Sequence, residues 1–275
     1  MRLTSLCKGA TATVAPFSFA AGCACLLVTA AGSVSASDCP AVRVDERVQV
    51  VHVYDGDTVK LKDGRRLRLI GINTPETARA GESGEPLAST ARTSLQTMLD
   101  RGNRVLHLQY GAQHNDHYGR LLAHAFLENG DNVAAGLLSH GLATALVVPP
   151  NTWAMDCYRQ LEDDARIDRL GLWALPQYQA VASSGLTADA TGFHIVRGLV
   201  TAVRGASHST WLDLRGPLAL HISHRDQTNF APRYLETLTG QEVEARGWIK
   251  PDRDGLRMNI RHPAALVKIS PGKLH

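Results

Sequence analysis

Two short segments of the sequence bring together residue types that suit chemistry on a phosphate group. Residues 68–76 read RLIGINTPE, in which an arginine lies inside an apolar strand and an amide and a glutamate follow where the strand must end. Residues 55–58 read DGDT and add two carboxylates. A guanidinium binds phosphate oxygens in pairs, and carboxylate, amide and carbonyl oxygens bind hard cations. The two segments together predict a metal-assisted phosphate site.

The oxygen donors of these segments predict a calcium site. Calcium binds carboxylates, amide oxygens and backbone carbonyls, and one of each is offered by Asp57, Asn73 and the carbonyl of Thr74. Pro75 favours an extended backbone at the residue before it, which directs that carbonyl outward. The alternative interpretation of residues 55–57 is a tight turn with Asx capping, which is the commoner one for such a segment alone.

Two charged residues in this region suit the reaction itself. Arg68 can bind the phosphate, although a structural ion pair is an alternative. Glu76 can act as a general base toward water. A third segment, residues 116–120, reads DHYGR and offers Arg120 for the phosphoryl group and Tyr118 for contact with a phosphate or a base. An exposed loop explains this third segment equally well.

The elements that must position these residues are mostly short strands. Alternating or β-rich stretches at 48–54, 58–61, 67–72, 105–108, 121–127 and 142–148 predict strands. Helical spacing predicts helices after Pro86, over 132–140 and after a Thr152 cap. This order predicts a mainly β fold with helices (α+β), an OB-type five-stranded Greek-key barrel with three helices over 45–176. A polar linker over 177–191 and a second small OB-like barrel over 192–270 follow.

The motifs occur in the order and spacing of a known family. DGDT at 55–58, RLIGINTPET at 68–77, YGR at 118–120 and GLW at 171–173 resemble the thermonuclease family of staphylococcal nuclease-like domains, over roughly residues 48–173. The resemblance implies an OB-type barrel and a calcium-dependent endonuclease that hydrolyses DNA and RNA and leaves 3′-phosphates. It also implies roles for individual residues: Asp57 and the Thr74 carbonyl as metal ligands, Arg68 and Arg120 at the phosphoryl group, and Glu76 as the base.

The chain departs from the family pattern at several positions. Asn73 stands where the family often has an aspartate ligand, and His117 stands where a lysine may contact phosphate. Leu146 and Val148 lie where tyrosines can contact the nucleotide. An amide offers an oxygen without a charge, so we expect a working site with weaker calcium binding.

The N-terminus and the cysteines predict an exported protein. Residues 1–36 carry two cations, no acid, an apolar run and small residues before position 36, as in a signal peptide cut after Ala36. Two of the 29 Lys and Arg and none of the 26 acids leave with it, so the charge becomes 27 − 26 = +1, too low for a strongly basic nucleic-acid binder. Cys39 and Cys157 then form one disulfide or remain two buried thiols. We expect a periplasmic or secreted protein with no membrane attachment after cleavage.

The leading hypothesis is therefore an exported metal-dependent nuclease acting on DNA, RNA or both, with no protein partner implied. The alternatives are a non-catalytic nucleic-acid-binding protein on the same fold and a hydrolase of another phosphodiester. In the second barrel, Arg246 and Trp248 share one strand face and could stack on bases, although core packing of Trp248 is the favoured interpretation.

Overall fold

Five strands in the first half of the chain close into a barrel because their apolar side chains alternate with polar ones. The computed structural model describes residues 38–78 and 83–269, so the expected signal peptide lies outside the described residues. In β1, Val48, Val50 and Val53 are buried and most of the intervening side chains are exposed. The five strands are β1 (Glu46–Val53), β2 (Thr58–Leu61), β3 (Arg66–Leu69), β5 (Val105–Asn115) and β6 (Leu121–Phe126).

The order of the strands around this barrel is that of an OB-type fold. The closed ring runs β1-β2-β3-β6-β5, and β5 pairs back to β1. In chain order, the third and fifth strands of the barrel, β3 and β6, are parallel to each other, whereas the other neighbours are antiparallel. This is a five-stranded Greek-key arrangement, and it confirms the predicted fold class.

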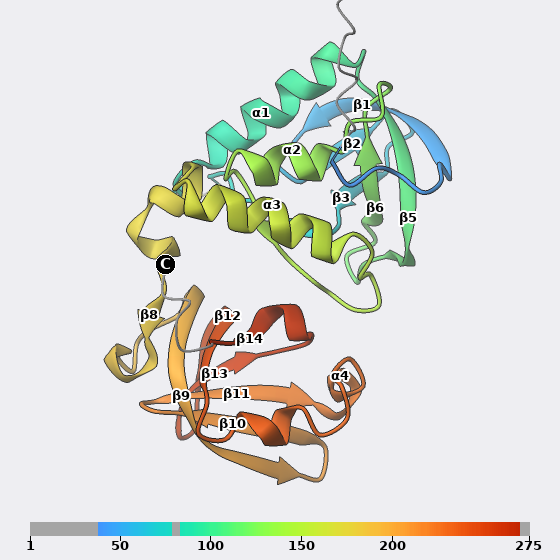
Figure 1. Ribbon diagram of the computed structural model, residues 1–275. Helices are drawn as coiled ribbons and strands as arrows, with labels where there is room; N and C mark the ends of the chain where they lie inside the picture. Colours follow the sequence, from blue (N-terminus) through green and yellow to red (C-terminus); the bar gives the residue numbers. More distant parts are fainter. Residues whose placement is uncertain (1–37, 79–82, 270–275) are drawn as a thin grey trace, which may run out of the picture. The chain divides into compact units, whose positions relative to one another are not determined.

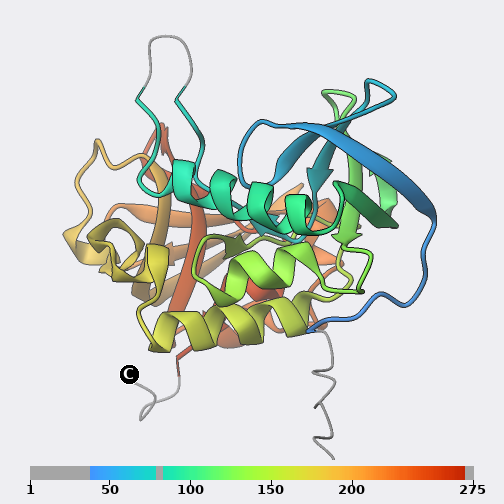
Figure 2. The same cartoon turned by 90° about the horizontal axis from the view of Figure 1, so that it is seen from above.

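Three helices accompany the first barrel, and α2 contacts both of the others (Figures 1 and 2). They are α1 (Ala88–Arg101), α2 (Val133–Ser139) and α3 (Met155–Ile167). The side chain of Asn132 caps α2 by accepting a hydrogen bond from the backbone N–H of Ala135 at 3.1 Å. The predicted Thr152 cap of α3 is wrong. Ala154, with φ of 59°, precedes the helix instead, and no side chain caps it.

Two predicted strands are shorter than their sequence patterns suggest. The run 67–72 divides at Gly71, with φ of 90°, into β3 and the two-residue strand β4 (Ile72–Asn73). The run 142–148 contains only β7 (Thr144–Ala145), which pairs with β4 outside the barrel. The 3₁₀ helix η1 (Gly171–Ala174) then buries Trp173.

A second five-stranded ring with the same order follows. Its strands are β9 (Gly192–Ala206), β10 (Ser209–Leu214), β11 (Leu218–Ser223), β12 (Glu242–Asp252) and β13 (Gly255–Asn259). Neighbours run β9-β10-β11-β13-β12, and β12 pairs with β9 to close the ring. As in the first barrel, the third and fifth strands are the parallel pair. Inward residues such as Leu212, Leu220 and Met258 are fully buried in a core of their own.

Shorter elements complete the described chain. They are β8 (Val181–Ala182), β14 (Leu266–Lys268), α4 (His224–Gln227) and the 3₁₀ helices η2 (Pro176–Tyr178), η3 (Ser183–Gly185), η4 (Leu235–Leu238) and η5 (Pro263–Ala265). Residues 177–191, the expected linker, include β8, which pairs in parallel with β9. The hydroxyl of Ser183 donates to the carbonyl of Arg215 at 2.6 Å. No helix in the described part of the chain is long and apolar enough to cross a membrane.

The described residues belong to one compact unit, and α3 and β12 share ion pairs within it. Glu162, which is fully buried, pairs with Arg246, and Arg166 pairs with Glu244 at 2.7 Å. The hypothesis that Arg246 stacks on bases is therefore wrong, because its guanidinium is buried on a carboxylate. The expected core position of Trp248 is also wrong: 41% of its surface is exposed, and its ring lies edge-on to another aromatic ring, 5.2 Å away.

Candidate phosphate and cation site

The end of β3 is shaped by Gly71, because any larger residue there would displace a neighbouring side chain. A Cβ at Gly71 would lie 2.4 Å from the ring of Tyr158, and its positive φ favours glycine as well. The turn at Gly71 carries the chain from β3 into β4, which ends at Asn73. Arg68 and Asn73 are thereby brought to the same end of the barrel.

Asp57 is held at the centre of this site by four donors. Its Oδ2 accepts hydrogen bonds from the backbone N–H of Thr74 at 2.8 Å and from the Thr74 hydroxyl at 3.0 Å. Its Oδ1 accepts from the hydroxyl of Thr58 at 3.0 Å. The preceding Gly56 leaves no room for a side chain, because a Cβ there would lie 2.8 Å from Cγ2 of Thr74. The DGDT segment therefore does more than form a turn: it packs a buried carboxylate against the segment after β4.

Arg68 provides the fourth donor, and it links that carboxylate to Asn73. Its Nη1 lies 2.5 Å from Oδ2 of Asp57, and its Nη2 donates to Oδ1 of Asn73 at 3.2 Å. Nη1 also donates to the backbone carbonyl of Leu69 at 3.1 Å. Because the Arg68 side chain is 13% exposed, its charge lies in a poorly solvated position next to one carboxylate and one amide.

Asp55 is a second buried acid of the site, and the sequence pattern predicted no separate role for it. It is 5% exposed, and its Oδ1 accepts from the backbone N–H of Asp57 at 3.1 Å. Burial, followed by the negative charge of Asp57, raises the pKa of Asp55 to about 7, and the charge of Glu76 acts in the same direction. Its adjacency to Asp57 in the DGDT segment was the signal for it.

Glu76 lies at the exposed edge of this group. Its backbone N–H donates to Oε2 of Glu85 at 2.9 Å, and its carbonyl accepts from the backbone N–H of Glu85 at 2.9 Å. These two hydrogen bonds join Glu76 directly to Glu85. The negative charge of Glu76 is the last of the causes that raise the pKa of Asp55.

The loop that follows β5 carries the second arginine. Asp116 holds it in place, since its Oδ2 lies 2.6 Å from Nε of Arg120 and its Oδ1 accepts from the backbone N–H of Arg120 at 2.9 Å. The guanidinium carbon of Arg120 lies 5.6 Å from the centre of the Tyr118 ring, and the rings of His117 and Tyr118 are 3.7 Å apart. Tyr118 is 74% exposed, so its ring is open to a ligand.

Arg68, His117 and Arg120 line one hollow of about 440 Å³. Leu146 and Val148 also line it. Apolar side chains therefore form the wall at the two positions where the family resemblance implies that tyrosines can contact the nucleotide. The predicted residues therefore divide into two neighbouring groups that share Arg68. One group lines the hollow, and the other is the hydrogen-bonded set of Asp57, Asn73 and Thr74.

The chemistry of the donor set fits a hard divalent cation. Within residues 38–78 and 83–269, no three His, Cys, Asp or Glu side chains cluster as metal ligands. The available donors instead are one carboxylate, the Oδ1 of Asn73 and the carbonyl of Thr74, which calcium accepts. Two acids, Asp55 and Asp57, lie close enough to raise the pKa of the first, so a positive charge there would relieve their repulsion.

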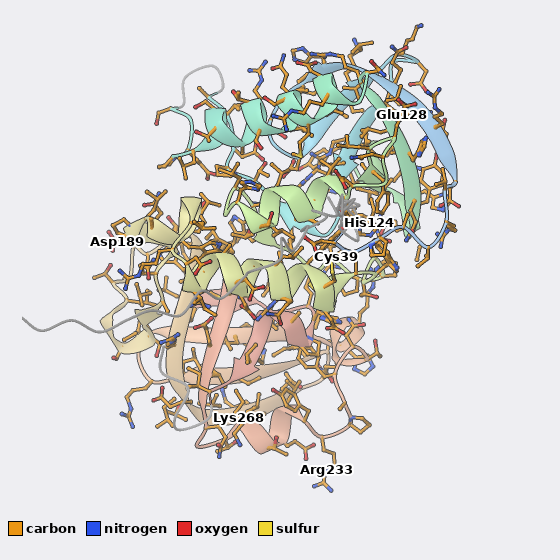
Figure 3. The ribbon with its side chains drawn as sticks, turned by 45° about the horizontal axis from the view of Figure 1, so that its top comes forward. Cys39, His124, Glu128, Asp189, Arg233 and Lys268 are labelled. Atoms are coloured by element: carbon orange, nitrogen blue, oxygen red, sulfur yellow. A yellow bond between two sulfur atoms is a disulfide. The ribbon has the colours of Figure 1, made fainter. Side chains whose placement is uncertain are left out.

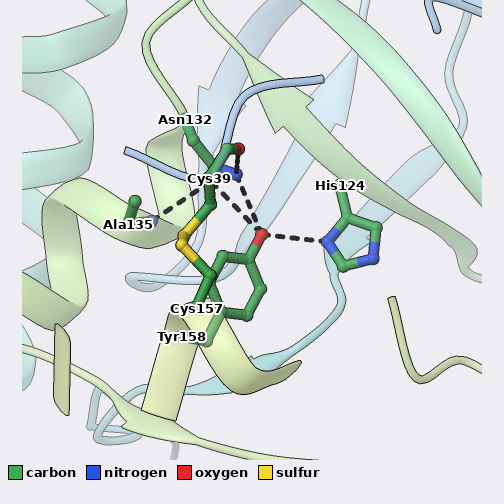
Figure 4. The surroundings of a disulfide bond; sticks show 6 residues. All are labelled: Cys39, His124, Asn132, Ala135, Cys157 and Tyr158. Atoms are coloured by element: carbon green, nitrogen blue, oxygen red, sulfur yellow. Dashed lines mark hydrogen bonds between the residues drawn. A yellow bond between two sulfur atoms is a disulfide. The ribbon is translucent and has the colours of Figure 1, made fainter. Parts of the chain in front are cut away.

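A disulfide fixes the N-terminal segment to α3 next to the turn at Gly71. Cys39 and Cys157 are bonded, with their Cα atoms 5.9 Å apart (Figures 3 and 4). Adjacent to it, the Tyr158 hydroxyl lies 3.0 Å from Nδ1 of His124 and 3.1 Å from Nδ2 of Asn132 (Figure 4). Because Tyr158 is the residue against which Gly71 packs, this network supports the strand end that carries the site.

Comparison with known proteins agrees with this barrel fold. The sequence profile of the family described as "Staphylococcal nuclease homologue" matches residues 66–175. The chain is 35% identical over 132 residues to the thermonuclease of Staphylococcus intermedius, covering 46% of this chain and 76% of that protein. The chain therefore belongs to the family of staphylococcal nuclease homologues.

Two relatives from Bacillus subtilis are also similar in this region. Endonuclease YncB is 34% identical over 135 residues, which are 48% of this chain and 63% of that protein. The SPbeta prophage-derived endonuclease YokF is 30% identical over 167 residues, 59% of this chain and 53% of that protein. The chain thus spans less than two thirds of the length of each of these two relatives. The family match ends at residue 175, before the second barrel begins at β9.

Proposed function

We propose that this chain is an exported, calcium-dependent endonuclease that hydrolyses phosphodiester bonds in DNA, RNA or both. The observation that carries the proposal is the position of Arg68, whose guanidinium contacts Asp57 and Asn73 while it lines the same hollow as Arg120. Oxygen ligands for a cation and N–H donors for a phosphate are thus found at the same end of one strand. The relatives named endonuclease and thermonuclease share this part of the chain.

The cation would be held by Asp57, by Oδ1 of Asn73 and by the carbonyl of Thr74. When bound, calcium supplies Lewis-acid stabilisation of the negative charge that grows on the phosphate. The hydrogen bonds from Thr74 and Thr58 fix both oxygens of Asp57, so the carboxylate is already oriented before any ligand arrives.

The two arginines bind the scissile phosphate. Each presents a planar fork of N–H donors that matches two phosphate oxygens, and this match improves as charge accumulates in the transition state. Asp116 orients Arg120 through its Nε, which leaves the terminal nitrogens directed to substrate. With Asp57 neutralised by a bound cation, Arg68 would be available to the phosphate.

Glu76 takes the proton from the attacking water. Its side chain is exposed at the edge of the acid group, where water reaches it, and general bases of this kind contribute about 10²–10⁴ in rate. The new bond forms between the water oxygen and phosphorus while the bond to the 5′-oxygen breaks. That oxygen takes a proton from water and leaves as a 5′-hydroxyl, and the 3′-phosphate remains. The disulfide between Cys39 and Cys157 suits the oxidising compartment of an exported protein.

One observation favours a second candidate, a protein that binds nucleic acid without cutting it. Arg68 already neutralises Asp57, and Asn73 brings no charge, so the attraction for a cation is weaker than two free carboxylates would provide. In that case the hollow with Arg68 and Arg120 would still bind phosphates.

A plasmid-digestion assay separates the two candidates. Wild-type protein is incubated with calcium or with a chelator, beside the variants Glu76→Gln and Glu128→Gln. Glu128 is an exposed glutamate of the same barrel that pairs with Arg47 at 2.6 Å, so it serves as the matched control (Figure 3). We expect cleavage only with calcium, a loss of about 10²–10⁴-fold in Glu76→Gln, and no loss in the control. Binding without cutting at any metal concentration would favour the second candidate.

A further inference from the structure

The second barrel carries an aromatic and cationic surface on the outer face of its third strand. Trp211 on β10 pairs with His221 on β11, and His221 pairs with Asn259 on β13, so the three side chains form one row across the sheet. The rings of Trp211 and His221 lie 4.5 Å apart. Nδ1 of His221 lies 3.1 Å from Oδ1 of Asn259, which orients the imidazole. The row is therefore a fixed platform with a half-buried indole at one end.

Arginines flank this platform on two sides. Arg257 is two residues from Asn259 on the same face of β13, and its buried Nε has no hydrogen-bond partner within the described residues. Arg225 on α4 and Arg261 after β13 line, together with Arg257 and His221, a hollow of about 450 Å³. Asp226 offsets part of this charge by pairing with Arg261 at 3.5 Å. The hollow retains an excess of positive charge.

The platform occupies the position in the second barrel that is equivalent to the candidate site of the first. Both barrels have the same strand order with a parallel third and fifth strand. In the first, Arg68 lies on the outer face of the third strand, between Thr58 and Leu122 on its neighbours. In the second, His221 lies on the outer face of the third strand between its own two neighbours. OB-type barrels bind oligonucleotides on the face of their second and third strands.

The two hollows are joined by shared residues. Arg225 and Arg261 line the hollow of Arg257 and also the hollow of Arg68 and Arg120. A chain of phosphates that enters the first hollow therefore meets cations continuously as far as the platform. Aromatic side chains that stack on bases, beside cations spaced along the backbone, are the features with which proteins hold single-stranded nucleic acid.

We propose that the outer face of β10, β11 and β13 binds single-stranded DNA or RNA and holds the strand that leaves the phosphate site. The inference rests on the proposed function for its choice of ligand. Trp211 stacks on a base, and Arg225, Arg257 and Arg261 bind phosphates. The second barrel thereby extends the length of strand that the protein contacts.

The test measures the binding of a fluorescent 20-nucleotide thymidine strand to the full chain in chelator, over a series of salt concentrations. The variants are Arg225→Gln with Arg257→Gln, and separately Trp211→Leu. Arg233→Gln is the matched control, because this arginine is on the same barrel, is 85% exposed and lines neither hollow (Figure 3).

We expect the double arginine variant to bind about tenfold more weakly and to lower the slope of log Kd against log salt by about 1.4. Trp211→Leu is expected to weaken binding about tenfold without changing that slope. Equal affinities and slopes for wild type, both variants and the control would overturn the proposal. Since Arg225 is exposed, its single replacement by Gln is the reserve if another variant fails to fold, and it is expected to lower the slope by about 0.7.

Cleavage of a dinucleotide, whose one phosphodiester occupies the first hollow, separates this proposal from the proposed function. Unchanged dinucleotide cleavage in Trp211→Leu, whose side chain lines neither hollow, with slower cleavage of the 20-nucleotide strand, supports the proposal. A wild type that binds the strand in the manner described and cuts nothing would refute the nuclease and leave the platform intact. A wild type that cuts both substrates, with variants that match it on both, would refute the platform alone.

Discussion

Replacing Asn73 with aspartate adds one carboxylate where the structure has an amide oxygen 3.2 Å from Arg68. With an effective dielectric constant of about 20, a divalent cation about 4 Å from the new charge gains roughly 8 kcal/mol of gross attraction. In the cation-free site the same charge gains roughly 4 kcal/mol from Arg68 and loses roughly 3 kcal/mol by repulsion from Asp57.

Desolvation of the additional charge removes most of the difference between these gross terms. We expect a net gain of about 1.4–2.8 kcal/mol, so that half-maximal cleavage requires about 10- to 100-fold less calcium. The assay is the rate of DNA cleavage against calcium concentration for the wild type and Asn73→Asp. Gln96→Glu, on the exposed face of α1, adds the same charge away from the site and is the control. An unchanged calcium requirement in Asn73→Asp would refute this account of Asn73.

Three further predictions concern stability. Burial lowers the pKa of His124 to about 3 from its usual 6.5, so the unfolded chain binds more protons below pH 6.5. The free energy of unfolding should therefore fall as the pH drops from about 6.5 toward 3. In denaturant titrations, His124→Gln should show a weaker dependence on pH. The same pH dependence in the wild type and in His124→Gln would contradict this prediction. Arg246→Ala leaves the buried Glu162 without its main cation and should cost about 3–5 kcal/mol in the same titration, whereas a cost below about 1 kcal/mol would contradict the ion pair. Replacing both Cys39 and Cys157 by serine opens a loop of 118 residues and should lower the free energy of unfolding by about 2–5 kcal/mol. A double serine variant as stable as the oxidised wild type would contradict this prediction.

The sequence was sufficient for the order of the elements because local patterns encode it. The β-rich pattern placed β2 at its observed position, and helical spacing placed α1 and α2 within one or two residues. It failed at the run 142–148, because an apolar run has the same composition in a strand and in a buried loop. The break falls at Gly71, where a Cβ would meet the ring of Tyr158; the apolar run continues through Ile72, so the hydrophobic pattern alone did not mark it.

The candidate site was predictable as a set of residues but not as a set of contacts. The motifs named Asp57, Arg68 and Asn73, while the structure shows that the arginine bonds to both of the others. That contact depends on the closure of the barrel and on the turn into β4. Similarly, Arg246 alternates with core residues on β12, and only the fold shows that a buried glutamate from α3 faces it.

The most direct test of the central claim follows the cleavage of a closed circular single-stranded DNA by wild-type protein and by Arg68→Lys. A circular substrate has no ends, so only internal hydrolysis converts it to a linear strand. Lysine keeps the charge but loses the planar fork that binds two phosphate oxygens. The account predicts calcium-dependent linearisation by the wild type that a chelator abolishes and that Arg68→Lys slows at least about 100-fold. Equal rates for the two proteins, or wild-type cleavage that persists in chelator, would contradict it.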